Sequence, residues 1–359
     1  MSQQFYSKIT GTGSYIPPKK VYNEQFLKNE FYASDGSPLQ KEGEEIIEKF
    51  KEITTIQERR YVDDEFVTSD IAFFAALEAI KSAGIDKEEL DYVIVAHNFG
   101  DVSVDNKQLN MVPSLASRVK YKLEIKNPDT VAYDVPFGCP GWLQAVIQAD
   151  YFIKAGDAKK VLVIGAEVLS RVSDPHDRDS MLYADGAGAV ILQSEKSDEP
   201  IGILAHKTRS DTYTHSKMLF MGESYNKDVG GENLFLKMNG RRLYQYALET
   251  VPQAIKSCLE KSGVDINDVS KVFIHQANGK MDDAILERLY TLYGLDQSPE
   301  KVMPMTVSWL GNSSVATIPT LLDLVYKNKF EGHALKEGEF VVFASVGAGM
   351  NINALVYKV

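Results

Sequence analysis

Cysteine is scarce in this sequence, and its scarcity excludes several kinds of protein. Two cysteines among 359 residues cannot build a disulfide framework or a zinc site of four thiolates. The six histidines are scattered, and no two of them have the spacing of a metalloprotease motif. We therefore expect no metal centre, and the low cysteine content favours a reducing, cytoplasmic environment.

Long apolar runs are missing as well. No segment approaches the roughly 20 consecutive apolar residues that a membrane-spanning helix needs. The first residues, MSQQFYSKIT, lack the basic start and apolar run of a signal peptide. The sequence therefore predicts a protein without a membrane segment.

Positive charge is in deficit. Lysine and arginine number 39 against 50 aspartates and glutamates, which gives a net charge of −11. A nucleic-acid partner is not expected, because phosphates require a basic surface. An acidic protein partner would need a local basic patch. Apolar residues make up 44% of the chain and charged residues 25%, which is typical of a folded globular protein.

The sequence contains an internal repeat. Residues 84–95 (GIDKEELDYVIV) resemble residues 263–274 (GVDINDVSKVFI), 179 positions later. A second pair of apolar strings, VLVIG at 161–165 and VVFAS at 341–345, is offset by 180 positions. Each of these four segments follows a stretch with apolar residues at helical spacing, namely 70–83, 139–156, 240–262 and 313–328.

Continuous apolar strands between helices predict an α/β protein whose sheets are covered on both faces. The repeat reflects either a duplication or a chance likeness of two ordinary α/β units, and the agreement of the two offsets favours duplication. We place the two halves at residues 1–197 and 198–359. A long irregular insertion, rich in glycine, aspartate, serine and tyrosine, is expected at about 208–236.

Cys139 is the first candidate for chemistry. It follows the predicted strand VAYDV and a glycine-rich turn, and it stands at the start of a predicted helix. Free N–H groups and the helix dipole at such a position favour a thiolate, the form in which cysteine acts as a nucleophile. The alternative is a buried, inert cysteine. Cys258, at an apolar position of a predicted helix, is expected to be such a core residue.

Two further candidates lie in the second half. His275 ends a predicted buried strand, where α/β proteins commonly place ligand-binding residues, although a structural histidine would fit there too. Asn312 begins a predicted helix in the position that Cys139 holds in the first half, and capping that helix is its alternative role. A pseudo-twofold axis would bring both helix starts together, with His275 approaching from the same side. Asn278 is expected to cap the helix that follows His275.

Glycines follow the last buried strand. Gly347 and Ala348 stand directly after VVFAS and could let the backbone approach a substrate and offer it an N–H group. The alternative is a simple tight turn. No glycine string here has the context of a dinucleotide-binding fingerprint.

Six strings, in this order, resemble the β-ketoacyl-acyl-carrier-protein synthase III group of thiolase-fold condensing enzymes. They are GCPGW (138–142), SDPHDRDSMLYADGAGAVIL (173–192), LKMNGRRLYQYA (236–247), IHQANGKM (274–281), LGNSSVAT (310–317) and SVGAGMN (345–351). The resemblance covers nearly the whole chain. It implies a thiolase-like α/β fold, in which duplicated βαβα halves form a five-layered αβαβα sandwich, and a homodimer.

The resemblance also implies roles for the candidates. Cys139 would take an acyl group from a thioester, and His275 and Asn312 would bind the thioester oxygen of a malonyl unit while it loses carbon dioxide. Backbone N–H groups of Cys139 and of Gly347–Ala348 would form the oxyanion hole. The implied reaction is a decarboxylative Claisen condensation in fatty acid or specialised lipid or polyketide biosynthesis, without a metal or redox cofactor.

The family's contact with acyl carrier protein maps onto a single string after the histidine, Gln276, Ala277, Asn278, Gly279 and Lys280. Lys280 is at a position where the family has a basic residue. Acyl carrier protein is acidic, so Lys280, with Arg241 and Arg242, would supply the local basic patch that the net charge hides. The alternative is that these are ordinary solvated surface cations.

The sequence departs from the family in two places. Lys49 and Ile53 stand where members primed by coenzyme A carry a tryptophan and an arginine, and Thr55 replaces a glycine. Priming by a carrier-protein-bound or other acyl donor is therefore favoured over priming by coenzyme A. Val112 replaces a phenylalanine that, in the family, closes the partner subunit's acyl pocket, so a longer or bulkier acyl chain is expected.

Two other functions fit the same scaffold. One is a non-condensing acyltransferase that passes the acyl group from Cys139 to an alcohol or an amine. The other is a catalytically silent partner subunit, against which the presence of all three candidate residues argues.

Overall fold

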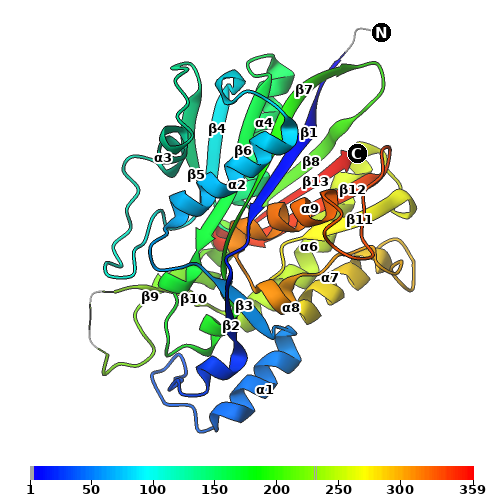
Figure 1. The fold of residues 1–359 in the computed structure, drawn as a ribbon. Helices are drawn as coiled ribbons and strands as arrows, with labels where there is room; N and C mark the ends of the chain where they lie inside the picture. Colours follow the sequence, from blue (N-terminus) through cyan, green and yellow to red (C-terminus); the bar gives the residue numbers. More distant parts are fainter. Residues whose placement is uncertain (1–3, 230, 232) are drawn as a thin grey trace.

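The computed structural model describes residues 4–229, 231 and 233–359. Two β-sheets organise this part of the chain (Figure 1). Across these residues, no helix is both long enough and apolar enough to pass through a membrane.

The first sheet has the strand order β1-β7-β6-β4-β5. Its central strand β6 is parallel to β4 and antiparallel to β7, and β4 is parallel to the edge strand β5. The strands are β1 (Gln4–Tyr15), β4 (Tyr92–His97), β5 (Val131–Pro136), β6 (Lys160–Val168) and β7 (Asp185–Ser197).

The second sheet repeats this arrangement. Its order, read from the matching edge, is β8-β13-β12-β11, with β11 parallel to β12 and the other pairs antiparallel. Where the first sheet has β5, the second has a single backbone hydrogen bond from Val272 N–H to the Val302 carbonyl, at 2.8 Å. The strands are β8 (Gly202–Ser210), β11 (Val269–Ile274), β12 (Phe340–Gly347) and β13 (Asn351–Lys358).

Helices fill three layers around the two sheets. Buried residues of α2 and α3 pack on the outer face of the first sheet, and those of α6 and α7 on the outer face of the second. Helices α4 and α9 lie between the sheets and share one core with both. The result is the expected αβαβα sandwich, with α2 (Thr68–Ala83), α3 (Leu115–Lys122), α4 (Gly141–Ala155), α6 (Gly240–Ser262), α7 (Gly279–Thr291) and α9 (Thr317–Tyr326).

The central strands are apolar on both faces because both faces are covered. In β6, Val161 and Val163 face the core between the sheets, whereas Leu162 and Ile164 face α2. Side chains alternate across a strand, so a strand buried on both sides reads as an unbroken apolar run. This explains why the central strands of both halves appear in the sequence as unbroken apolar strings, from which the repeat could be recognised.

The repeat also holds at the level of single hydrogen bonds. Gly84 and Gly263 end α2 and α6 with φ of 64° and 72°, a left-handed conformation that glycine adopts without steric cost. Two residues later, Asp86 and Asp265 each accept a hydrogen bond from a backbone N–H two positions on, at 3.0 and 2.8 Å. The same local structure therefore leads into β4 and β11.

The remaining elements form smaller units. Strands β2 and β3 pair antiparallel, and α1 and α8 pack with them in a separate apolar cluster at the lower end of Figure 1. These elements are β2 (Lys19–Tyr22), α1 (Gly43–Thr54), β3 (Glu58–Tyr61) and α8 (Val307–Leu310).

Three sequence-based boundaries need correction. Helix α4 begins at Gly141 rather than 139, and the helix expected at 313–328 divides into a 3-10 turn at Ser314–Ala316 followed by α9. The insertion expected to be irregular over 208–236 contains regular structure where it is described, and its apolar residues Met218, Leu219, Met221 and Leu236 pack against the apolar clusters of the body. It holds the end of β8, then α5 (Thr212–His215), β9 (Leu219–Gly222) and the start of β10 (Phe235–Met238).

A buried carboxylate joins the two halves. Asp323 of α9 accepts hydrogen bonds from the hydroxyls of Thr12 and Ser14 on β1, at 2.7 and 2.6 Å, and pairs with Lys327 at 2.7 Å. The residue is only 2% exposed. Because hydrogen bonds to charged groups are stronger than those between neutral groups, this contact fixes α9 against the first sheet.

We expect Asp323→Ala to lower the free energy of unfolding by about 3 kcal/mol, since it leaves one buried hydroxyl, one partly buried hydroxyl and a lysine without their acceptor. Urea denaturation measures the change. The matched control is Asp198→Ala, an exposed carboxylate in the turn between the sheets, which should stay within about 0.5 kcal/mol of the parent. Equal midpoints for the two variants would contradict the role of Asp323.

Candidate active site

Cys139 lies in the turn between β5 and α4, at the N-terminal end of a helix as predicted. Gly138 has φ of 69°, and its carbonyl accepts a hydrogen bond from the Gly141 N–H at 2.9 Å. This left-handed residue turns the chain sharply, and Cys139 is left partly exposed. Cys258, by contrast, is fully buried in the core of α6, as predicted.

The turn before α4 touches the loop after β12. A Cβ on Gly138 would lie 2.8 Å from the Ala348 nitrogen, and one on Gly347 would lie 2.5 Å from the Cys139 nitrogen. Both approaches are too close for any side chain. The structure therefore brings together the backbone segments predicted to supply the oxyanion hole.

Asn312 is held at the same junction by its backbone. Its N–H donates to the Leu182 carbonyl at 2.9 Å, and its carbonyl accepts from the Ala184 N–H at 2.8 Å. The side-chain Oδ1 accepts from the Ser314 N–H at 2.8 Å, but the N-cap of the following 3-10 turn is Ser313, so Asn312 does not have the capping position considered from the sequence. Because this bond fixes which end of the amide is the oxygen, the Nδ2 group keeps its hydrogens for another acceptor.

His275 continues the line of β11. Its backbone N–H donates to the Ala344 carbonyl at 2.9 Å, and the residue is 7% exposed. Burial lowers its pKa to about 4, with the Ser314 backbone acting weakly in the opposite direction. The imidazole is therefore neutral at physiological pH and can donate a hydrogen bond without adding charge.

Ser314 connects the three candidates and was not singled out from the sequence. Its hydroxyl donates to the Cys139 sulfur at 3.3 Å, its N–H bonds to Asn312, and its backbone faces His275. Its φ is 53°, which is uncommon for a residue other than glycine. The string LGNSSVAT contains this serine, but the long-range contact with Cys139 has no signature in sequence.

The thiol of Cys139 is not acidic in this environment. Desolvation raises its pKa to about 11, the hydrogen bond from Ser314 lowers it, and the charge of Glu167 raises it. The stabilisation of the thiolate expected from the helix start is therefore outweighed by desolvation of the sulfur in this structure. Deprotonation has to be assisted by hydrogen-bond donors that face the sulfur.

The segment after His275 is only partly available to a partner. Gln276 is fully buried, its Nε2 donates to the Pro304 carbonyl at 2.7 Å, and its Oε1 accepts from the Thr306 N–H at 2.7 Å. We therefore remove its side chain from the predicted carrier-protein contact, because its polar atoms are used within the fold. Ala277 and Asn278 are partly exposed, and Lys280 is exposed.

Asn278 and Gly279 also have structural roles. Asn278 caps α7, as expected, by accepting a hydrogen bond from the Met281 N–H at 3.2 Å. Gly279 is buried, and a Cβ there would lie 2.3 Å from the hydroxyl oxygen of Thr55. Thr55, which ends α1 with φ of 65°, therefore occupies the space that a side chain at position 279 would need.

The other residues predicted to lie at the surface are exposed to solvent. Arg241 and Arg242, in the first turn of α6, are exposed. Arg242 borders a groove of about 580 Å³ to which Arg209 and Lys217 add positive charge, and Asp211 and Glu249 negative charge. Lys49 pairs with Glu52 at 2.8 Å on the surface of α1, and Ile53 is 42% exposed.

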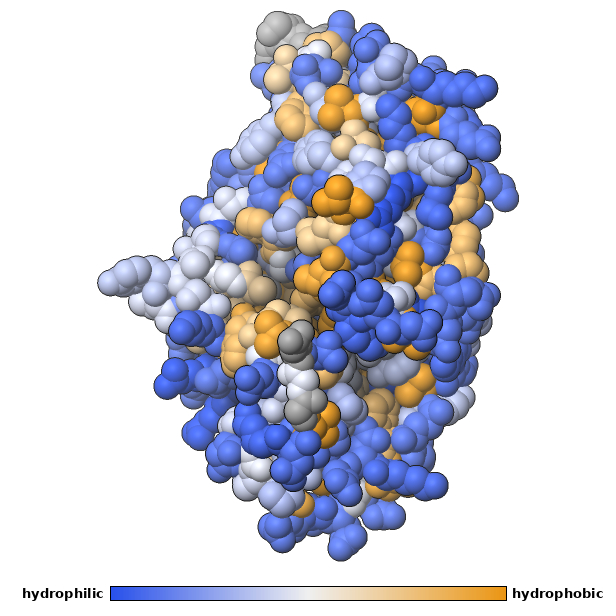
Figure 2. All heavy atoms as spheres, turned by 90° about the vertical axis from the view of Figure 1, so that its left-hand side faces the viewer, coloured by the Kyte–Doolittle hydropathy of each residue, from blue (hydrophilic) through white to orange (hydrophobic). Residues whose placement is uncertain are grey.

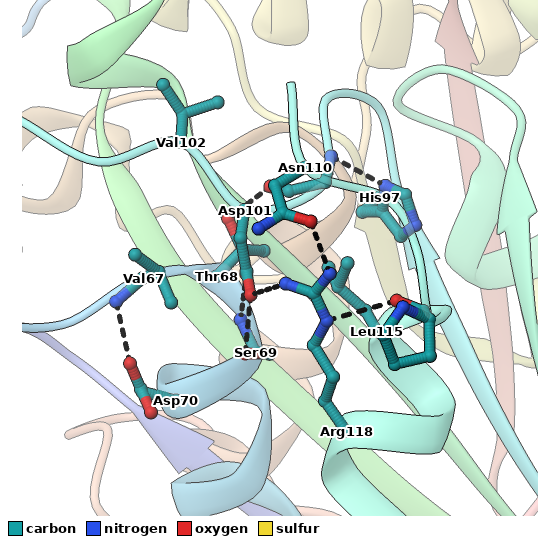
Figure 3. A network of polar contacts seen from close by, with 12 residues as sticks. Val67, Thr68, Ser69, Asp70, His97, Asp101, Val102, Asn110, Leu115 and Arg118 are labelled. Carbon is teal, nitrogen blue, oxygen red and sulfur yellow. Dashed lines mark hydrogen bonds and ion pairs between the residues drawn. The ribbon is translucent and has the colours of Figure 1, made fainter. Parts of the chain in front are cut away.

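Val112 is on an exposed loop and is 87% exposed. The base of this loop is fixed by Arg118, which pairs with Asp101 at 2.5 Å and donates to the side chain of Asn110 at 2.6 Å (Figure 3). Figure 2 faces the side of the molecule where α3 lies in Figure 1, and it shows hydrophobic residues among hydrophilic ones. Exposed apolar residues of the loop and its neighbours are Val104, Leu109, Met111, Val112, Tyr121 and Val131.

Comparison with known proteins identifies the family. Residues 133–212 match the family model of 3-oxoacyl-[acyl-carrier-protein] synthase III, and residues 259–359 match the model of its C-terminal part. A β-ketoacyl-[acyl-carrier-protein] synthase III from Xanthomonas campestris pv. campestris is 33% identical over 356 residues, which cover 97% of each chain.

Solved structures agree with this result. The β-ketoacyl-[acyl-carrier-protein] synthase III of Thermus thermophilus is 31% identical and superposes with a TM-score of 0.80, covering 98% of this chain and 99% of the other. The priming β-ketosynthase of the R1128 polyketide pathway is 26% identical with a TM-score of 0.80, over 99% and 97% of the two chains. The thiolase-like fold is thus confirmed, and the chain belongs to the β-ketoacyl-[acyl-carrier-protein] synthase III family of condensing acyltransferases.

Proposed function

We propose that Cys139 carries the acyl group and that His275 and Asn312 activate the malonyl unit. The observation that carries this assignment is the Ser314 contact network, which brings the Cys139 sulfur, the Asn312 amide and the His275 imidazole around one residue. The neutral state of His275 and the free Nδ2 of Asn312 suit donors to a developing enolate oxygen.

In the acylation step, the Cys139 sulfur attacks the carbonyl carbon of the donor thioester. The carbonyl oxygen gains negative charge, which the N–H groups of Cys139 and Ala348, next to Gly347, would bind. The carbon–sulfur bond of the donor then breaks, and the donor leaves as a thiol with the proton that Cys139 loses. A thiol exchanges readily with a thioester because entering and leaving groups are of similar strength.

In the condensation step, the carbon–carbon bond to the malonyl carboxylate breaks and carbon dioxide leaves. The electron pair forms an enolate, whose oxygen would accept hydrogen bonds from His275 and Asn312. The enolate carbon then attacks the acyl carbonyl on Cys139, and the cysteine leaves as a thiolate and regains a proton. Each step is heterolytic, so the proposal calls for no redox cofactor, and it calls for no metal because hydrogen-bond donors are assigned to each developing oxyanion.

We further propose that both thioesters arrive on an acidic acyl carrier protein. The exposed Lys280, Arg241 and Arg242 support a local basic contact on a chain of net charge −11. The replacement of the coenzyme A clamp by Lys49 and Ile53, both at the surface of α1, supports a carrier-bound primer. A second copy of this chain, in the cytoplasm, would cover the apolar loop that carries Val112.

The nucleophile can be tested by intact-mass spectrometry with a panel of acyl-carrier-protein and acyl-CoA donors. The parent should gain one acyl mass, and Cys139→Ala should gain none and lose condensation by at least about a thousandfold. Cys258→Ala is the control, because this cysteine is buried in α6, and it should keep the adduct. An adduct on Cys139→Ala would refute the assignment.

Asn312→Asp separates condensation from simple acyl transfer. The aspartate keeps the oxygen that accepts from the Ser314 N–H but loses the amide donor and adds a negative charge near the enolate. Acylation of Cys139 should continue, whereas carbon dioxide release from a malonyl donor should fall by at least about a hundredfold. Unchanged release would remove Asn312 from the enolate site, and an acyl product without release would favour the non-condensing acyltransferase.

Val112→Phe tests the acyl pocket. If Val112 borders the pocket of a partner copy, the larger ring should lower the ratio of octanoyl to acetyl turnover by about tenfold or more. Val104→Phe makes the same change at another exposed valine of the loop, 39% exposed, and should leave the ratio unaltered. A parent enzyme that already prefers acetyl strongly, or an equal effect of both variants, would contradict the proposal.

A further inference from the structure

A chain of three polar residues leads away from the candidate nucleophile into the first sheet. Ser314 donates to the Cys139 sulfur at 3.3 Å, and Asn98 Nδ2 donates to the Ser314 hydroxyl at 3.1 Å. Glu167 Oε2 accepts from the same Nδ2 at 2.5 Å and from the Asn98 backbone N–H at 2.9 Å. These residues come from β6, from the end of β4 and from the turn before α9, so tertiary folding alone brings them together.

The chemistry of the groups fixes the direction of every bond in this chain. The Asn98 backbone N–H donates to Glu167 Oε2, so this oxygen is an acceptor and the NH₂ end of the Asn98 amide faces it as the second donor. The second hydrogen of that NH₂ group then points at Ser314, whose oxygen accepts it. The one hydroxyl hydrogen of Ser314 is left to point at the sulfur of Cys139.

Two features of this arrangement cost free energy, and the surrounding fold maintains both. Glu167 is fully buried, and its Oε1 finds no hydrogen-bond partner among the described residues. Ser314 is held at φ of 53°, a region that costs a non-glycine residue free energy and that is concentrated at functional sites. A purely structural position would be better served by glycine at 314 and by an apolar residue at 167.

We propose that Ser314 is a catalytic residue that donates a hydrogen bond to the Cys139 thiolate, and that Glu167, through Asn98, is the positioning residue that orients this donor. The inference rests on the proposed role of Cys139 as the nucleophile. Ser314 supplies the hydrogen-bond donor that a desolvated thiolate needs, because desolvation raises the pKa of the Cys139 thiol to about 11.

Glu167 affects the pKa of Cys139 in two opposite directions. Its charge raises this pKa, whereas its positioning of Ser314 lowers it, so the two effects can be told apart by the sign of the shift. A nearby negative charge disfavours the thiolate and raises the pKa of Cys139, and burial raises the pKa of Glu167 itself to about 7. Removing the charge alone would ease thiolate formation. Removing the orientation of Ser314 would hinder it.

The experiment measures the rate of alkylation of Cys139 by iodoacetamide as a function of pH. The Cys258→Ala substitution is present throughout, so that Cys139 is the single cysteine that can react. This readout does not require the condensing activity. Ser314→Ala and Ser314→Gly should both move the apparent pKa upward by about one to two pH units. Glycine suits a positive φ, so Ser314→Gly should fold even if the alanine variant does not.

The matched control is Ser313→Ala, which removes the neighbouring buried hydroxyl and should leave the profile in place. Profiles of both Ser314 variants that superpose on this control would overturn the proposal. If these profiles superpose while Cys139 still acquires the acyl adduct, only the inference about Ser314 fails. If Cys139→Ala acquires the adduct, the proposed function fails first.

A double-mutant cycle tests positioning by Asn98 and Glu167. Asn98→Ala should raise the apparent pKa in the parent background but not on top of Ser314→Gly, where the hydroxyl that it orients is absent and where loss of its hydrogen bond to Glu167 can only weaken the charge of that carboxylate. Glu167→Leu should lower the pKa in the Ser314→Gly background, where only its charge matters, and lower it less or raise it in the parent. Equal shifts in both backgrounds would show that neither residue positions Ser314.

Discussion

The backbone at Gly138 and Cys139 touches the backbone at Gly347 and Ala348, and the geometry of the whole site follows from this contact. A single Cβ at either glycine would overlap the opposite backbone. The first segment belongs to the β5–α4 connection of one half and the second to the β12–β13 connection of the other, so the contact joins the two halves at the site. It brings the backbone of Cys139, the proposed nucleophile, against the backbone of the other half, an approach too close for any residue with a side chain at either glycine.

Much of the fold could be predicted because the sequence patterns that specify its strands and helix ends are short-range. The apolar strings of β6 and β12, the glycines that end α2 and α6, and the aspartates that follow them are all short-range signals. Cys139, His275 and Asn312 could be located for a similar reason, since each lies at a strand or helix end within a recognisable string. Their proximity in space could be predicted from the repeat, because a pseudo-twofold axis between the two copies brings the corresponding helix starts together.

The rest of the site depends on contacts that no local pattern encodes. Asn98 and Ser314 are 216 positions apart, and Asn98 and Glu167 are 69 apart, so their hydrogen bonds exist only in the folded chain. Gln276 looked like a surface residue beside His275, but its side chain turns into the fold to satisfy the backbone near Pro304. The high pKa of the Cys139 thiol was hidden for the same reason, because desolvation depends on every segment that surrounds the sulfur.

The carboxylate of Asp323 has a consequence for motion. It ties α9 of the second half to β1 of the first through two hydroxyls and lies within the core that both sheets share. Moving the halves apart would expose an apolar core and strip a charged group of its donors at the same time. A relative movement of the two sheets would therefore carry a cost in free energy that displacement of surface loops and side chains does not.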